Sequence, residues 1–408
     1  MIRFIKLLSV AILLPVFSYA QSNFKPGYVI TLTGDTTHGL INLKDALYPR
    51  EITFKKESTG SSQVFTANDI KYFQVDNIVA FRKYAGAISA DNTDISKIGI
   101  GSNAKSERVV VFLRLEEGGP NVSLYSYADN TKTRYFIAKQ DQQPDELVYR
   151  VYYTSGQNSY TKTEAGYKAQ LLELANIYAT DSKGLLDEIE QAKYNVADFR
   201  SITRRINNTK VSKNVSKLPT AVFFAGVGIN STKFEPSGSF PFFNPQSHTS
   251  LFPKIALGVN LYPNPAVGKL IFRGEVSFTK NSYKTDVDSY TDNRPLSKST
   301  YAFDQYVFAV SPQIQYHLYN ADDFKFYVNA GVSLNVSKYT GNSYHNNYTD
   351  QTNDHVLDMD ALWVSFPVKT GIVLNKKIEI FATYIFPASF SPSMELRSIQ
   401  AGINYIFN

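Results

Sequence analysis

The residues able to do catalytic or metal chemistry are few and scattered. The chain has no cysteine, which excludes thiolate nucleophiles, thiolate metal sites and disulfides. Neither an HExxH motif nor a glycine-rich phosphate loop is present. Five histidines remain, which are His38, His248, His317, His345 and His355.

Two of these histidines fall in one acidic segment. His345 and His355 share it with four aspartates, Asp350, Asp354, Asp358 and Asp360. A Ser/His/Asp site at a barrel rim would need such residues to converge, and a weak Ca²⁺ site would use the carboxylates, although the D-x-D-x-D-G spacing is missing. A solvated loop explains the same residues, so we predict no catalytic residue, no cofactor and no metal site.

A second set of charged residues lies on the polar faces of alternating segments. These are Lys254, Arg273, Glu275, Lys325, Lys369 and Glu379. Charges that leave water must be paired, so we expect a structural ion network inside a barrel. A path for a proton or solute is the alternative.

The segments that carry these charges alternate with a period of two, which is the period of a β-strand. The last one, Ser398 to Asn408, places Ile399, Ala401, Ile403, Tyr405 and Phe407 on one face, and only Ile406 breaks the polar series opposite. The pattern recurs seven times upstream, in 221–230, 254–261, 270–279, 305–318, 324–337, 362–374 and 378–386. Eight is the smallest number of strands in an outer-membrane barrel.

The connections between these strands alternate in length. Three are short, 264–268, 320–323 and 375–377, whereas 235–251, 284–300 and 340–360 are long and polar and 387–394 is intermediate. Short periplasmic turns and long outer loops are typical of outer-membrane barrels. We therefore predict an eight-stranded antiparallel transmembrane barrel over 218–408, with both of its ends on the periplasmic side.

The chain before the barrel divides into several parts. Residues 1–20 have Arg3 and Lys6, an apolar run and the small residues Ser18 and Ala20, as in a secretory signal peptide. Short strands over 21–155 predict a periplasmic all-β domain, including a hairpin through Gly34 and Asp35. Helical spacing marks 160–208, where Thr161 and Glu164 match a capping box, and 209–217 is a polar linker. These helices either pack on the β-domain or bind a partner.

The composition limits the partners and the kind of membrane span that we expect. The net charge of +6 is small for 408 residues and comes from scattered Lys and Arg, so nucleic acid is not an expected partner. No apolar run of 18 or more residues follows the signal, which leaves a barrel as the way to span a membrane. We expect a mainly β fold. Because the predicted barrel would span the outer membrane, we also expect outer-membrane lipid as a partner.

The segments GYVITLTGDTTHGLINLKD and GINYIFN, together with the signal peptide, resemble the outer-membrane β-barrel proteins of Bacteroidota, whose barrel is related to the PorT family. The resemblance implies an outer-membrane location and, for some relatives, a part in secretion or envelope assembly. We expect a non-enzymatic barrel that anchors a periplasmic domain, with a possible periplasmic protein partner. A small barrel enzyme of lipid hydrolase or acyltransferase type, or a narrow solute conduit, is the alternative.

Overall fold

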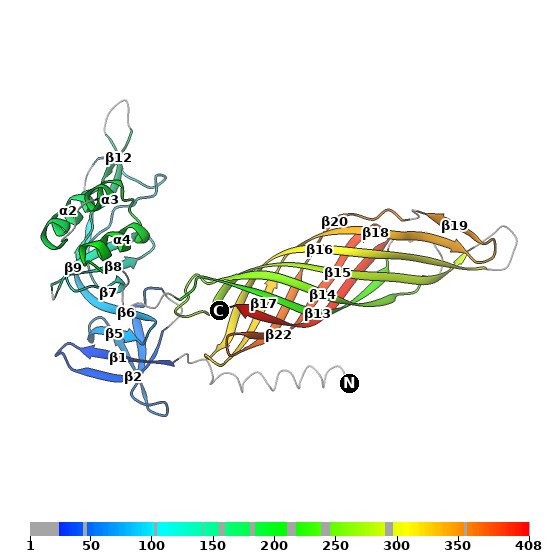
Figure 1. Cartoon of the computed structure of the whole chain (residues 1–408), viewed down its shortest axis with the longest axis horizontal. Coiled ribbons are helices and arrows are strands. Elements are labelled where there is room, and N and C mark those ends of the chain that lie inside the picture. The colour runs from blue at the N-terminus through cyan, green and yellow to red at the C-terminus, as the bar shows by residue number, and fades with distance from the viewer. Residues whose placement is uncertain are drawn as a thin grey trace. The chain divides into compact units, whose positions relative to one another are not determined.

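The computed structural model describes residues 24–43, 47–101, 104–140, 142–154, 160–179, 184–209, 218–237, 245–289, 297–354 and 357–407. The predicted signal peptide and residues 210–217 of the predicted linker lie outside them. The described chain is mainly β-structure with three helices. It divides between Leu218 and Pro219 into an N-terminal unit, Ser22–Leu218, and a C-terminal unit that contains Pro219–Asn408 (Figure 1).

The N-terminal unit is built on an antiparallel sheet of ten strands in the order β10-β9-β8-β7-β6-β5-β1-β2-β3-β4. The strands are β1 (Phe24–Thr31), β2 (Thr36–Asn42), β3 (Glu51–Lys55), β4 (Ser62–Thr66), β5 (Ile70–Val75), β6 (Val79–Ser89), β7 (Ser106–Glu117), β8 (Val122–Ala128), β9 (Thr133–Lys139) and β10 (Asp145–Glu146). The predicted hairpin is confirmed as β1 and β2. Its turn needs Gly34, whose φ is +107°.

Three helices cover one face of this sheet: α2 (Gly166–Tyr178), α3 (Leu185–Gln191) and α4 (Val196–Ile206). Their apolar sides share one core with strands β8 and β9, in which Leu171 and Phe199 are fully buried beside Leu124 and Ile137. Helix α4 is capped at its start, because the Asn195 side chain accepts a hydrogen bond from the Asp198 backbone NH. The helices are therefore part of the β-domain rather than a separate segment.

The predicted capping box is wrong. Thr161–Glu164 forms strand β12, which pairs with β11 (Arg150–Tyr153), and α2 follows only at Gly166 without a side-chain cap. The backbone groups of Thr161–Glu164 are satisfied by this neighbouring strand, which a pattern within one segment does not reveal.

The C-terminal unit is a closed antiparallel sheet. Strand β13 (Ala221–Pro236) pairs with β14 (His248–Leu261), then β15 (Leu270–Ser289) and β16 (Ser297–Asn320) follow in order. Strand β16 pairs with both β17 (Phe324–Gly331) and β18 (Ser333–Asn346), which meet β21 (Pro367–Leu374) and β20 (Leu362–Ser365). Strands β22 (Ile378–Ser391) and β23 (Met394–Phe407) complete the circuit, because β23 pairs with β13.

Parts of the predicted long loops are strand. Strand β15 continues to Ser289 and β16 starts at Ser297, within the predicted loop 284–300, and β18 with β19 (Gln351–Asp354) occupies part of 340–360. The physical reason is an inner apolar face: Val287 within the predicted loop 284–300, and Tyr283 and Tyr301 beside it, are buried in one cluster. The outward residues of these segments are polar, so the sequence pattern looked like that of a loop. No helix among the described residues is long and apolar enough to cross a membrane.

Candidate functional site

The outer face of the C-terminal unit is apolar around the strands. Phe223, Val227, Leu257, Ile399 and Val328 point outward and are 63%, 65%, 64%, 62% and 41% exposed. A soluble surface rarely carries such a continuous apolar patch, which normally marks contact with lipid or protein. We call the outward apolar residues of β13 to β23 the belt; it contains most of the exposed large apolar residues in the described part of the chain.

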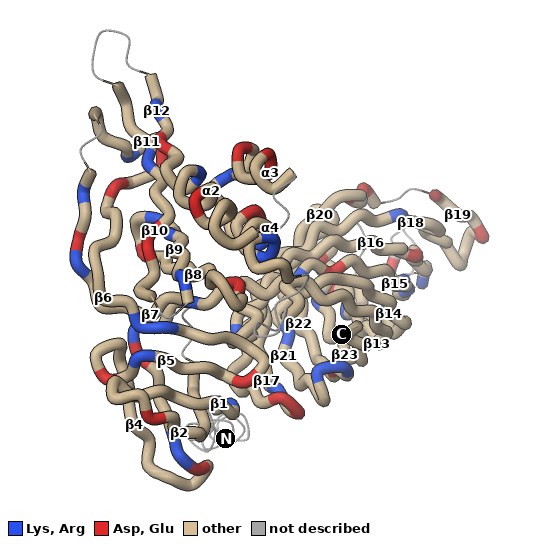
Figure 2. Tube along the Cα trace, turned by 60° about the vertical axis from the view of Figure 1, so that its left-hand side comes forward, with Lys and Arg blue, Asp and Glu red and all other residues tan. Residues whose placement is uncertain are grey.

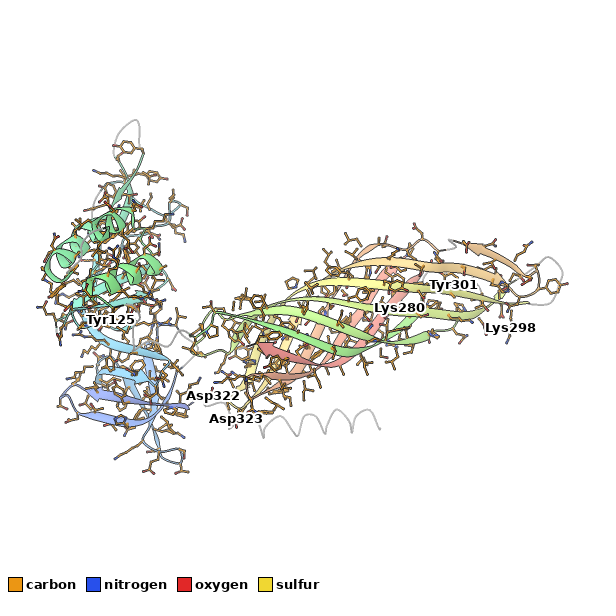
Figure 3. All side chains as sticks on the ribbon, in the orientation of Figure 1. Tyr125, Lys280, Lys298, Tyr301, Asp322 and Asp323 are labelled. Carbon is orange, nitrogen blue, oxygen red and sulfur yellow. The ribbon has the colours of Figure 1, made fainter. Side chains whose placement is uncertain are left out.

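Beyond the belt, the outward residues of several strands become charged. Across β13 and β23, Lys233 lies opposite Arg397, and both bind Glu235. On β15, Lys280 forms an ion pair of 2.8 Å with Asp304 of β16. Lys280 and Lys298 lie on the part of the barrel away from the turn that holds Asp322 and Asp323 (Figure 3). Figure 2 shows charged positions near β17 and near β19, and others along the strands.

Five of the six predicted interior charges come together inside the barrel. Glu275 accepts hydrogen bonds from Lys254 at 2.9 Å and from Lys369 at 2.6 Å. Arg273 donates two parallel hydrogen bonds to Glu379 at 2.8 and 2.9 Å, the geometry in which guanidinium and carboxylate match best. Lys254, Arg273, Glu275, Lys369 and Glu379 are called the ion network below.

The five members of the ion network come from four strands. Lys254 is on β14, Arg273 and Glu275 are on β15, Lys369 is on β21 and Glu379 is on β22. All five are at most 8% exposed. The pairing of the strands therefore brings residues as distant in sequence as 273 and 379 into contact. Two amide side chains of β23 add to the network: Asn404 donates to Glu379 at 2.6 Å, and Gln400 accepts from Lys254 at 2.9 Å.

Lys325, the sixth predicted member, lies elsewhere. It is half-buried near the turn between β16 and β17 and donates to the Asn320 side chain. The parity that predicts an inward side chain does not give its depth along the strand. His317 is on the same part of β16, is 1% exposed, and its imidazole is bonded to the Gly268 carbonyl at 2.8 Å. It is held as a buried structural residue.

An apolar group closes over the ion network on its turn side. This turn-end cluster consists of Val222, Phe224, Tyr327, Val373 and Ile406. The Arg273 guanidinium stacks over the Phe224 ring, 3.7 Å from the ring centre. Ile406, which breaks the polar series of the last strand, is thus an inward residue of this cluster.

A larger aromatic group fills the barrel beyond the network. This hairpin-end cluster contains Phe234, Tyr283, Val287, Tyr301, Phe303, Val307, Tyr344, Leu357, Trp363, Ala388, Phe390, Met394 and Leu396. Trp363, the single tryptophan of the chain, donates to Ser337 Oγ at 2.8 Å. These contacts stabilise the long strands where the sequence predicted loops.

The acidic segment does not assemble a reactive site in the described residues. His345 is hydrogen-bonded to the Thr352 hydroxyl at 3.0 Å and lies 3.7 Å from the exposed Asp350 carboxylate. His355 lies outside the described residues. Within those residues, no group of three or more His, Asp or Glu side chains is placed to hold a metal ion.

Polar contacts that the sequence did not predict fix α4 to the sheet of the N-terminal unit. Arg200 binds Glu116, and Arg204 forms an ion pair of 2.8 Å with Glu117. The Asn207 side chain accepts from the backbone NH groups of Asn121 and Val122 and donates to the Val122 carbonyl. In the sequence, only the adjacent Glu116 and Glu117 and the spacing of Arg200 and Arg204 could have indicated this contact.

A buried arginine joins β9 to β6 in the same unit. Arg134 is fully buried, donates to the Ser89 carbonyl at 2.6 Å and forms an ion pair of 3.0 Å with Asp129. Burial acts to raise the pKa of Asp129, but hydrogen bonds from Arg134 and from two backbone NH groups outweigh it and hold that pKa below its ordinary value. Burial also raises the pKa of the Tyr135 phenol to about 12.

Comparisons with known proteins give no family. No protein-family model and no curated protein matches the chain. Solved structures similar to part of it include Ail of Yersinia pestis (12% identity, TM-score 0.26), covering 46% of this chain and 100% of that one. Neisserial surface protein A (16%, 0.26) and OprG of Pseudomonas aeruginosa (10%, 0.28) cover 46% of this chain and 99% and 97% of their own. These scores are low, and the barrel follows from the strand pairing described above.

Proposed function

We propose that the chain is a non-enzymatic outer-membrane protein whose eight-stranded transmembrane barrel anchors the N-terminal unit in the periplasm. The count of eight takes β17 with β18 and β20 with β21 as single spans, beside β13, β14, β15, β16, β22 and β23. The observation that carries the proposal is the belt, since apolar residues outside and paired charges inside reverse the arrangement of a water-soluble sheet.

The belt favours a bilayer over a protein partner because it follows the strands around the circuit. Outward apolar residues occur on β13, β14, β15, β16, β18, β21, β22 and β23. A protein interface would cover one side of the barrel, whereas lipid surrounds it. Charged residues such as Lys233 and Arg397 then lie at the level where the hydrocarbon ends.

The interior supports an anchor more than a conduit. An eight-stranded barrel has an interior just wide enough for side chains, and here the turn-end cluster, the ion network and the hairpin-end cluster follow one another along the axis. A solute path would have to separate these packed groups. The same filling leaves little room for a substrate, which supports the non-enzymatic proposal.

The N-terminal unit then supplies the function that the barrel positions. We propose a role in envelope interaction, assembly or secretion through a periplasmic protein partner, in line with the resemblance to Bacteroidota barrels. The experiment compares the full chain with residues 218–408 carrying a signal peptide. Both should fractionate with the outer membrane and run faster unboiled than boiled on gels, and only the full chain should retain a crosslinked periplasmic partner.

Two results would count against this proposal. Recovery of the full chain in the soluble periplasmic fraction would mean that the barrel does not anchor the chain in the outer membrane. Failure of residues 218–408 to assemble would mean that the two units form one folding unit.

A further inference from the structure

A small cavity lies inside the barrel between the ion network and the hairpin-end cluster. Its volume is about 50 Å³, room for a single small ion or one or two water molecules. Lys254, Glu275 and Lys369 of the network form part of its wall, and Val307, Trp363 and Leu396 of the cluster form another part. It therefore combines charged and apolar walls.

The charges around this cavity do not balance. The charged residues that are buried in the described part of the C-terminal unit are three cations, Lys254, Arg273 and Lys369, and two carboxylates, Glu275 and Glu379. The sum is +3 − 2 = +1. Strand dipoles alternate and leave only a small net field, so the sheet does not compensate this charge. An excess buried charge is costly unless a counter-ion pairs with it.

The excess lies at the cavity rather than deeper in the network. Arg273 and Glu379 form a balanced bidentate pair away from the cavity. Lys254 and Lys369 share the single carboxylate of Glu275, which also lies 3.6 Å from Arg273 Nε. Lys369 is 1% exposed and Lys254 is 8% exposed, so water at the surface does not screen them.

Two further side chains in the wall have capacity to bind a ligand. Thr383 Oγ1 and Gln313 Oε1 are buried, line the cavity and have no hydrogen-bond partner among the described residues. The two residues are 3% and 5% exposed. A hydroxyl can rotate to donate, and a half-turn of the Gln313 amide presents its NH₂ group. The wall can thus offer two ammonium groups, a hydroxyl and an amide to one acceptor.

We propose that the cavity binds a small monovalent anion of the halide class, chloride under ordinary conditions. The anion pairs with the excess charge of Lys254 and Lys369 and accepts hydrogen bonds from Thr383 and Gln313. The single excess charge favours a monovalent anion, and the volume of about 50 Å³ favours a small one. This site goes beyond the anchoring function and does not depend on it, because it follows from the barrel interior alone.

The test uses crystals of the full chain, purified and crystallised in bromide without chloride, and X-ray data collected at the bromine absorption edge. We expect an anomalous peak in the cavity, in contact with the Lys254 and Lys369 ammonium groups. A cavity that holds only water, or no peak, overturns the proposal. The wild-type chain answers this question, so the outcome does not depend on a variant that folds.

A pair of variants at one position tests the charge argument. Gln313→Glu places a carboxylate in the cavity and should abolish the bromide peak, whereas the neutral Gln313→Met should retain it. In solution, the unfolding midpoint of the wild type should be higher in chloride than in gluconate at equal ionic strength, and Gln313→Glu should lose this difference. A peak that persists unchanged in Gln313→Glu, or a midpoint equally sensitive to chloride, contradicts the proposal.

Discussion

The Arg273 and Glu379 pair allows a quantitative test of the barrel interior. Arg273→Met removes the partner of a carboxylate that is fully buried and receives two of its hydrogen bonds from the guanidinium, at 2.8 and 2.9 Å. Breaking a buried pair in this way costs about 3–5 kcal/mol, because one charge is left uncompensated. Replacing both residues, in Arg273→Met with Glu379→Met, should recover most of this loss, since apolar replacements of buried pairs are often neutral or stabilising.

Equilibrium urea unfolding in lipid vesicles, followed by the fluorescence of the single tryptophan Trp363, measures these differences. Lys376→Met is the control, because its ion pair with Asp322 is 3.1 Å long but half exposed, and such pairs contribute about 0–1 kcal/mol. The reasoning is refuted if Arg273→Met costs no more than Lys376→Met, or if the double replacement costs as much as the sum of the two single ones.

Three further predictions concern the belt, the α4 contact and pH. Val328→Arg on the belt should lower the free energy of unfolding in vesicles by about 2–4 kcal/mol, whereas Asn329→Ser at the next, inward position should lower it much less. Equal losses would mean that the outward and inward faces are assigned wrongly. Asn207→Ala should destabilise the N-terminal unit by about 2–4 kcal/mol, because two backbone NH groups lose their acceptor, and hydrogen exchange at Val122 should accelerate. Since Asp129 has a lowered pKa in the folded state, its contribution is present above the unfolded pKa and is lost as the pH falls through the folded one; Asp129→Asn should flatten the acid limb of the stability profile, and an unchanged limb would contradict this.

The strands and their facing could be predicted from the sequence because the period of two is a local property. Alternation placed Val328 outward and Asn329 inward, and the structure gives exposed fractions of 41% and 3% for them. The same parity brought Arg273 and Glu379 to the interior. Their direct pairing depends on the register between distant strands, which a single sequence does not contain.

The parts that could not be predicted depend on partners far along the chain. Thr161 and Glu164 match a capping box locally, but strand pairing with Tyr153 and Arg150 determines their conformation. Phe224 and Ile406 look misplaced in a polar face until the turn-end cluster shows what they contact. The described parts of the predicted loop 284–300 are strand because the buried Val287, with Tyr283 and Tyr301 beside the loop, packs in the hairpin-end cluster with residues of other strands.

The most direct measurement of the central claim is the lipid exposure of single spin labels on the full chain in bilayers. The chain has no cysteine, so Val310→Cys, Val328→Cys and Lys338→Cys each give one labelled site. The account predicts that labels at 310 and 328 relax strongly with oxygen and weakly with a water-soluble nickel complex, and that the label at 338, above the belt, shows the opposite preference. Nickel accessibility at 310 and 328 as high as at 338 would contradict a membrane-spanning barrel.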